Sequence, residues 1–96
     1  MAQAVEEVAQ SALESVNDFV VVLQAEGQAG LETRFRAIAR FLQEGAVAAA
    51  IAEFERGTYS GPGGLSDVYA VDQARFDGAW SQCASTLRAL KRATAK

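Results

Sequence analysis

The sequence contains no histidine and a single cysteine, Cys83, among its 96 residues. Without histidine, the chain lacks the commonest general base and a frequent zinc ligand, which excludes Ser-His-Asp triads, Cys-His dyads and most metal sites. One cysteine forms no disulfide within the chain. We therefore expect no metal ion, no cofactor and no enzymatic activity.

The sequence also lacks the segments that would direct it to a membrane. No stretch reaches eighteen consecutive apolar residues, so we expect no membrane-spanning helix. Glu6 and Glu7 stand where a signal peptide would begin with basic residues, and we therefore expect a cytoplasmic protein. The net charge of −3 argues against a nucleic-acid partner, because phosphate binding depends on a basic patch.

Bases are missing from the start of the chain and acids from its end. Residues 1–26 carry only acidic charges, at Glu6, Glu7, Glu14, Asp18 and Glu26. Residues 87–96 carry only basic ones, at Arg88, Lys91, Arg92 and Lys96. Helix dipoles favour this order of charges, because acids are stabilised at the start of a helix and bases at its end. The alternative is a functional polarity of the protein, with an acidic face and a basic tail. Three of the acids lie too far along the first helix for the dipole to explain them, so we expect them to face the last helix: Glu14, Asp18 and Glu26.

Apolar residues make up half of the chain, and their three- and four-residue spacing is typical of amphipathic helices. The length indicates a single domain over residues 1–96. The spacing predicts helices over residues 2–25, 31–43 and 46–56, and a last helix from residue 72 to residue 91 or beyond. Gly27, Gly45 and Gly57 follow the first three helices, where glycine tolerates the left-handed turn that ends a helix.

The last helix begins at a residue suited to cap it. Asp72 is a plausible N-cap, because its side chain can accept a hydrogen bond from the first turn. Cys83 falls on the apolar seam of this helix, between Trp80 and Leu87, so we expect it in the core. Gly78 costs about 1 kcal/mol relative to alanine in a helix, and we expect it to permit the close approach of a neighbouring backbone.

Residues 57–71 interrupt the helical pattern with four glycines and Pro62, the only proline. No regular element crosses residues 60–64, and a connection of this length is unusual in a helical bundle. The fold class that we predict is therefore all-α. We expect an irregular antiparallel bundle of four helices with a long Gly-rich loop before the last helix.

The Gly-rich loop is the first candidate site. A loop of this kind can present backbone N–H groups to an anion, but a phosphate-binding P-loop needs a lysine and a preceding strand, and both are absent. In the structural alternative, Ser66 or Asp67 caps a short helix and apolar side chains fill the core, from Leu65, Val68 and Tyr69. The candidate interaction surface consists of five loop residues: Tyr59, Gly61, Gly63, Asp67 and Tyr69.

Acidic residues near the loop form a second candidate: Glu53, Glu55, Asp67, Asp72 and Asp77. Paired carboxylates can perform acid–base chemistry or bind a divalent ion. Their spacing matches no calcium-binding loop. We therefore expect Asp72 to be a helix cap and Asp77 a charge of the first turn or of the solvated surface.

The order of these features resembles a family of small uncharacterised bacterial helical proteins. The resemblance covers about residues 16–90 and rests on the order of the elements. These are two helices, a Glu44-Gly45-Ala46 turn, a short helix, the stretch Gly-Pro-Gly-Gly-Leu-Ser-Asp-Val at residues 61–68, and a final helix. The family has a signature similar to Gly-Gly-Met-Gly-Ser-Leu-Asn-Asp-Leu. Five residues match it: Gly61, Gly63, Leu65, Asp67 and Val68. Gly64 and Ser66 replace its serine and asparagine. The resemblance implies the helical architecture and no particular activity.

These observations favour a protein-interaction or regulatory module, for example an immunity- or antitoxin-like partner of another bacterial protein. The alternative is a small-molecule or anion-binding domain that uses residues 60–69. The apolar content is high for so short a chain, so a homodimer interface at Val21, Val22 and Phe41 is a further expectation.

Overall fold

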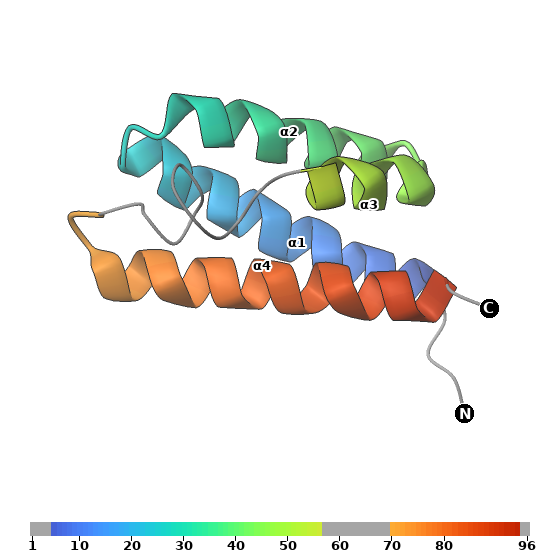
Figure 1. The fold of residues 1–96 in the computed structure, drawn as a ribbon. Helices are drawn as coiled ribbons and strands as arrows, with labels where there is room; N and C mark the ends of the chain where they lie inside the picture. Colours follow the sequence, from blue (N-terminus) through green and yellow to red (C-terminus); the bar gives the residue numbers. More distant parts are fainter. Residues whose placement is uncertain (1–4, 57–69, 95–96) are drawn as a thin grey trace.

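The computed structural model describes residues 5–56 and 70–94, which form four helices and no strand within these ranges. Figure 1 shows their order along the chain: α1 (Val5–Ala25), α2 (Ala29–Gln43), α3 (Val47–Arg56) and α4 (Gln73–Thr94). The predicted all-α class is confirmed. The predicted helix ends agree with the structure to within three residues.

Glycines end α1 and α2, as the sequence predicts. Gly27 has φ +71° and Gly45 has φ +77°, the left-handed conformation that glycine adopts without a side-chain clash. After α1, the N–H groups of Gly27 and Gln28 donate to the carbonyl oxygens of Gln24 and Leu23, at 3.2 and 2.9 Å. The turn after α2 repeats this pattern, which satisfies carbonyl groups that a helix end would otherwise leave without partners.

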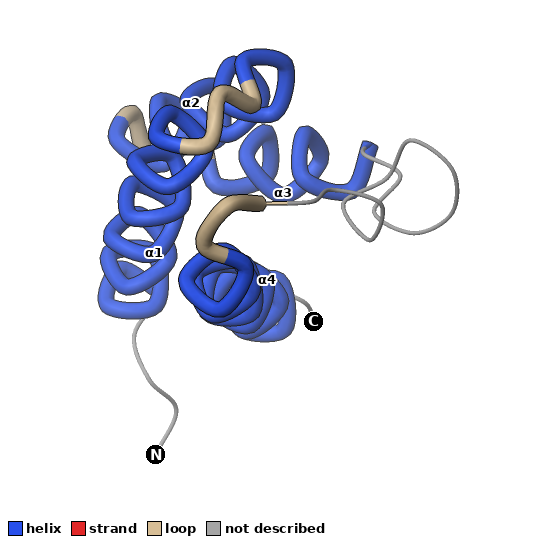
Figure 2. Tube along the Cα trace, turned by 90° about the vertical axis from the view of Figure 1, so that its left-hand side faces the viewer, coloured by secondary structure: helices blue, strands red, loops and turns tan. Residues whose placement is uncertain are grey.

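Consecutive helices run in opposite directions, as Figure 1 shows. The helix α1 packs along both α2 and α4, and α3 packs against α2 and, to a smaller extent, against α4. Figure 2 looks nearly along α4 and shows α1 and α3 on either side of it, with α2 beyond them. The four helices therefore enclose one core.

Aromatic rings from all four helices meet in this core. The Phe19 ring of α1 is fully buried, and its centroid lies 5.0 Å from that of Phe35, 5.4 Å from that of Phe76 and 5.7 Å from that of Trp80. The Phe54 ring of α3 reaches the same cluster through Trp80, at 6.2 Å. Edge-on and tilted arrangements of this kind add about 0.5–1.5 kcal/mol per pair to the burial of the rings.

The structure shows which apolar residues are buried where the sequence pattern does not decide. Val22 belongs to the core with an exposed fraction of 4%, whereas Val21 beside it is 53% exposed. Phe41 is partly buried and packs against the core. The expectation for Gly78 is wrong for the described residues, because a Cβ atom added there would meet none of their atoms within 4 Å. None of the described helices is both long and apolar enough to cross a membrane.

Candidate functional site

All residues of the interaction surface predicted from the sequence lie outside the described residues: Tyr59, Gly61, Gly63, Asp67 and Tyr69. The predicted cap at Ser66 or Asp67 and the predicted core residues of the loop lie there too. The structure does describe the point where this loop joins α4, and the surfaces of the four helices. The candidate sites below come from those parts.

A carboxylate from the end of α1 holds the start of α4. The Val71 N–H donates to Oε1 of Glu26 at 2.7 Å, and the Asp72 N–H donates to Oε2 of the same carboxylate at 3.1 Å. The predicted cap is confirmed, since Oδ1 of Asp72 accepts a hydrogen bond from the Arg75 N–H at 3.1 Å. Glu26 therefore meets α4 as expected, but through backbone N–H groups instead of a basic side chain.

These contacts use N–H groups that an anion would need. The Ala70 N–H is also engaged, because it donates to Oε1 of Gln73 at 3.0 Å. The amide of Gln73 in turn donates to Oδ1 of Asp77 at 2.8 Å. Anions bind where a helix start offers N–H groups together with its dipole. Oxygen atoms of this chain accept the hydrogen bonds of the three N–H groups that lead into α4, those of Ala70, Val71 and Asp72.

The described acidic residues near the loop each bind a different partner and do not form one cluster. Glu53 pairs with Arg56 at 2.9 Å, and Glu55 pairs with Lys91 of α4. Asp72 and Asp77 make the hydrogen bonds described above, and Asp67 lies outside the described residues. No group of three or more Asp, Glu, Cys or His residues suited to a metal ion occurs within residues 5–56 and 70–94.

Cys83 is a core residue, as predicted. Its exposed fraction is 0%. Burial raises the pKa of its thiol to about 12, because desolvation disfavours the thiolate. Since the thiolate is the nucleophile and the metal-binding form, this side chain is unreactive in the folded protein.

An apolar groove lies between the first half of α1 and the turn from α2 to α3. Five of its nine lining residues are apolar: Val5, Ala9, Leu13, Leu42 and Val47. Polar residues and a glycine line the remainder, namely Glu6, Gln10, Gln43 and Gly45. Val5 is 38% exposed, and Ala9 and Leu13 are partly buried. We call this feature the apolar groove.

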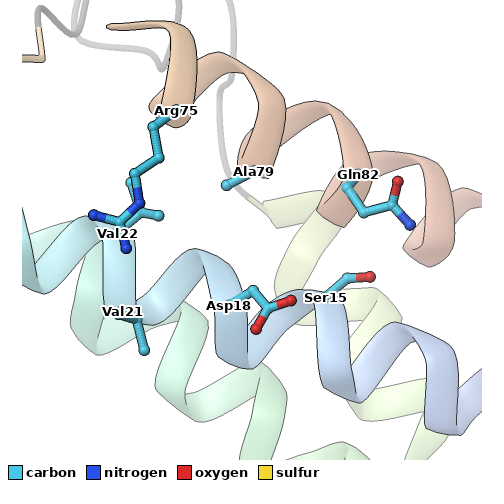
Figure 3. A pocket seen from close by; sticks show the side chains of 7 residues that line it. All are labelled: Ser15, Asp18, Val21, Val22, Arg75, Ala79 and Gln82. Atoms are coloured by element: carbon cyan, nitrogen blue, oxygen red, sulfur yellow. The ribbon is translucent and has the colours of Figure 1, made fainter. Parts of the chain in front are cut away.

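A second concavity, the α1–α4 hollow, lies beyond the middle of α1. It is lined by Ser15, Asp18, Val21 and Val22 of α1 and by Arg75, Ala79 and Gln82 of α4. In Figure 3, Arg75 reaches from α4 toward Val22, and Asp18 lies one turn away along α1. Within the described part of the chain, neither of these two charged groups takes part in an ion pair.

A third concavity lies along α2, and four of its six lining residues are polar or charged. Thr33, Arg36, Ala37, Arg40, Phe41 and Glu44 line it. Both of its arginines already have acidic partners, because Arg36 pairs with Glu32 of the same helix at 2.7 Å and Arg40 pairs with Glu44, which directly follows α2, at 3.2 Å. Such exposed pairs contribute about 0.3–0.5 kcal/mol each.

The acids of α1 form an exposed face. Glu6, Glu7, Glu14 and Asp18 are all exposed, and no ion pair involves any of them within residues 5–56 and 70–94. Glu14 has one long contact, from Nε2 of Gln10 at 3.4 Å. Asp18 faces the last helix as expected, because it lines the α1–α4 hollow together with Arg75. Neither Glu14 nor Asp18 forms an ion pair with the described part of that helix. The negative charge of α1 therefore faces solvent.

Comparisons with family models, with curated proteins and with solved structures give no match for this chain.

Proposed function

We propose that this chain is a protein-binding module whose partner docks in the apolar groove. The observation that carries the proposal is the groove itself, in which the exposed Val5 and the partly buried Ala9, Leu13 and Val47 lie beside the core residue Leu42. Apolar pockets bordered by polar groups are typical of sites where a partner inserts an anchor side chain. The groove has this composition.

The charge of α1 supports a basic partner. The groove opens on the helix whose exposed charges are all acidic, and Glu6 forms part of its rim. Complementary charges steer two proteins together and favour the right pairing. We therefore propose a partner that presents an apolar anchor flanked by lysine or arginine. A small acidic protein that covers a basic partner fits the immunity- or antitoxin-like role expected from the sequence.

The chemistry of the described residues gives more support to binding than to catalysis. Cys83 is buried with a raised pKa, and the acids nearest to the loop each have a separate partner. The free cysteine is compatible with the reducing cytoplasm that we propose as the location.

Affinity capture with matched variants tests the proposal. Ala9→Arg fills the groove with a long side chain, whereas Ala52→Arg adds the same side chain to an exposed position of α3 outside the groove. We expect one protein to copurify with the wild type and with Ala52→Arg, and to be lost with Ala9→Arg. Circular dichroism and the melting temperature serve to establish that both variants fold. Equal capture by all three proteins, or no specific capture, would contradict the proposal.

The alternative function is an anion or small-molecule site in residues 60–69, which lie outside the described residues. A thermal-shift experiment with inorganic phosphate and nucleotides separates the two functions. We expect an unchanged melting temperature. A rise in the wild type that Gly63→Ala abolishes would favour the alternative.

A further inference from the structure

Two adjacent rows of side chains run along α1 at the apolar groove. Val5, Ala9 and Leu13 line the groove at intervals of four residues, which places them one turn apart on the same face of the helix. Glu6 and Gln10 line it from the neighbouring row, and both are exposed. Because a helix rises by about 1.5 Å per residue, the apolar row extends over about 12 Å. The groove therefore offers α1 a contact along two turns, with polar groups on one side.

The middle of the apolar row is its lowest point. Ala9 carries only a methyl group, whereas Val5 and Leu13 on either side of it carry larger side chains. Leu42 and Val47 line the same groove from the segments that follow α1 in the chain. When two helices pack, an apolar side chain of one helix inserts into a space of this kind between four side chains of the other surface. The position over Ala9 is thus suited to one central anchor.

The surroundings of the groove favour a helical occupant over an extended one. No strand occurs within residues 5–56 and 70–94, so an extended peptide would find no sheet edge there to pair with. In the turn beside the groove, the N–H groups of Glu44, Gly45 and Ala46 already donate to carbonyl oxygens of α2. An extended segment would bury backbone polar groups without partners, whereas a helix satisfies its own.

We propose that the partner inserts an amphipathic basic helix into the apolar groove, an inference that rests on the proposed function. Apolar side chains of this helix, one turn apart, follow the apolar row of α1, and the central one lies over Ala9. Lysine or arginine residues beside them meet Glu6 and Glu14, which are exposed and form no ion pair within the described part of the chain. These two acids are eight residues apart, so the basic residues lie about two turns apart on the partner helix.

Charge reversal on α1 tests the basic side of the helix, with the copurified partner as the probe. Glu6→Lys and Glu7→Lys make the same change in the first turn of α1, but only Glu6 lines the groove. We expect Glu6→Lys to raise the dissociation constant about fivefold or more, and Glu7→Lys to raise it at most about twofold. Circular dichroism establishes that both variants fold. Equal dissociation constants of the two variants would overturn the proposal.

Mass spectrometry of the adduct formed by a photoreactive residue in place of Gln10 locates the segment that occupies the groove. We expect apolar residues every three or four positions in this segment, with lysine or arginine beside them. A synthetic peptide of the segment should gain helical circular dichroism when it binds the full chain, and a proline at its centre should weaken binding about tenfold or more.

The outcomes separate this inference from the proposed function. A peptide that does not bind, that binds without gaining helix, or that tolerates the central proline would overturn the helical occupant alone, since a protein would still dock in the groove. The absence of any copurified or crosslinked protein would contradict both.

Discussion

Replacing Glu26 tests how the loop is held to the bundle. Its carboxylate accepts hydrogen bonds from the N–H groups of Val71 and Asp72, which lie 45 and 46 residues further along the chain. Hydrogen bonds in proteins contribute about 0.5–1.5 kcal/mol each, and loss of a helix cap costs about 0.5–2 kcal/mol. Because the segment is exposed, water replaces part of each bond. We expect Glu26→Ala to lower the free energy of unfolding by about 1–2 kcal/mol.

Glu26→Gln refines this prediction. The amide keeps one acceptor oxygen but loses the negative charge near the start of α4, so we expect a loss of about 0.5–1 kcal/mol, intermediate between wild type and alanine. Glu14→Gln is the matched control, since Glu14 lies exposed on the same helix with only one long contact.

Urea unfolding followed by circular dichroism measures both changes, and about 1 kcal/mol corresponds to a shift of roughly 4–8 °C in the melting temperature of a domain this size. If Glu26→Ala changes the stability no more than Glu14→Gln does, the carboxylate does not hold the start of α4.

Two further predictions concern Cys83 and the glycines. The pKa of the buried Cys83 thiol is about 12, whereas an unfolded thiol titrates near ~8.5. At pH values between these two pKa values, the Cys83 thiol is deprotonated in the unfolded chain and protonated in the folded protein. The free energy of unfolding should therefore fall with rising pH, by up to about 1.4 kcal/mol per unit, and more steeply than in Cys83→Ala; equal slopes in urea titrations would refute this. Gly78→Ala should stabilise the protein by about 0.5–1 kcal/mol, because its site is open and helical. Gly27→Ala should destabilise it by about 1 kcal/mol, because φ is +71°. Melting temperatures that shift in the same direction would contradict the glycine assignments.

The helices could be predicted from the sequence because local signals mark most of their ends. Gly27, Gly45 and Asp72 fix three ends through backbone conformation or capping, and the structure uses all three in that way. The sequence places the start of α2 two residues too late, because Gln28 makes no side-chain cap and leaves no signal in the sequence.

The sequence was less informative about which face of a helix is buried. Residues 19–23 are five apolar residues in a row, so their spacing does not distinguish Val21 from Val22. The direction in which α2 and α4 pack against α1 decides between them, and that direction is a property of the whole bundle. The clear seam of α4, in contrast, placed Cys83 correctly in the core.

The candidate sites could not be predicted from the sequence, because they too depend on how the helices pack in the whole bundle. The apolar groove combines Ala9 and Leu13 with Leu42 and Val47, and the α1–α4 hollow combines Asp18 with Arg75. No local pattern relates positions so far apart in the chain. The contact of Glu26 with the backbone at residues 71 and 72 also leaves no pattern in the sequence, because every residue type except proline supplies an N–H group.

Site-specific photo-crosslinking tests the central claim, that a partner protein docks in the apolar groove, most directly. A photoreactive residue in place of Gln10 lies on the rim of the groove, and the same residue in place of Gln24 lies on an exposed part of α1 that lines no described concavity. Irradiation in the cells that produce the protein should give one covalent adduct with a second protein from position 10 and none from position 24. No adduct from position 10, or the same adduct from both positions, would contradict the account.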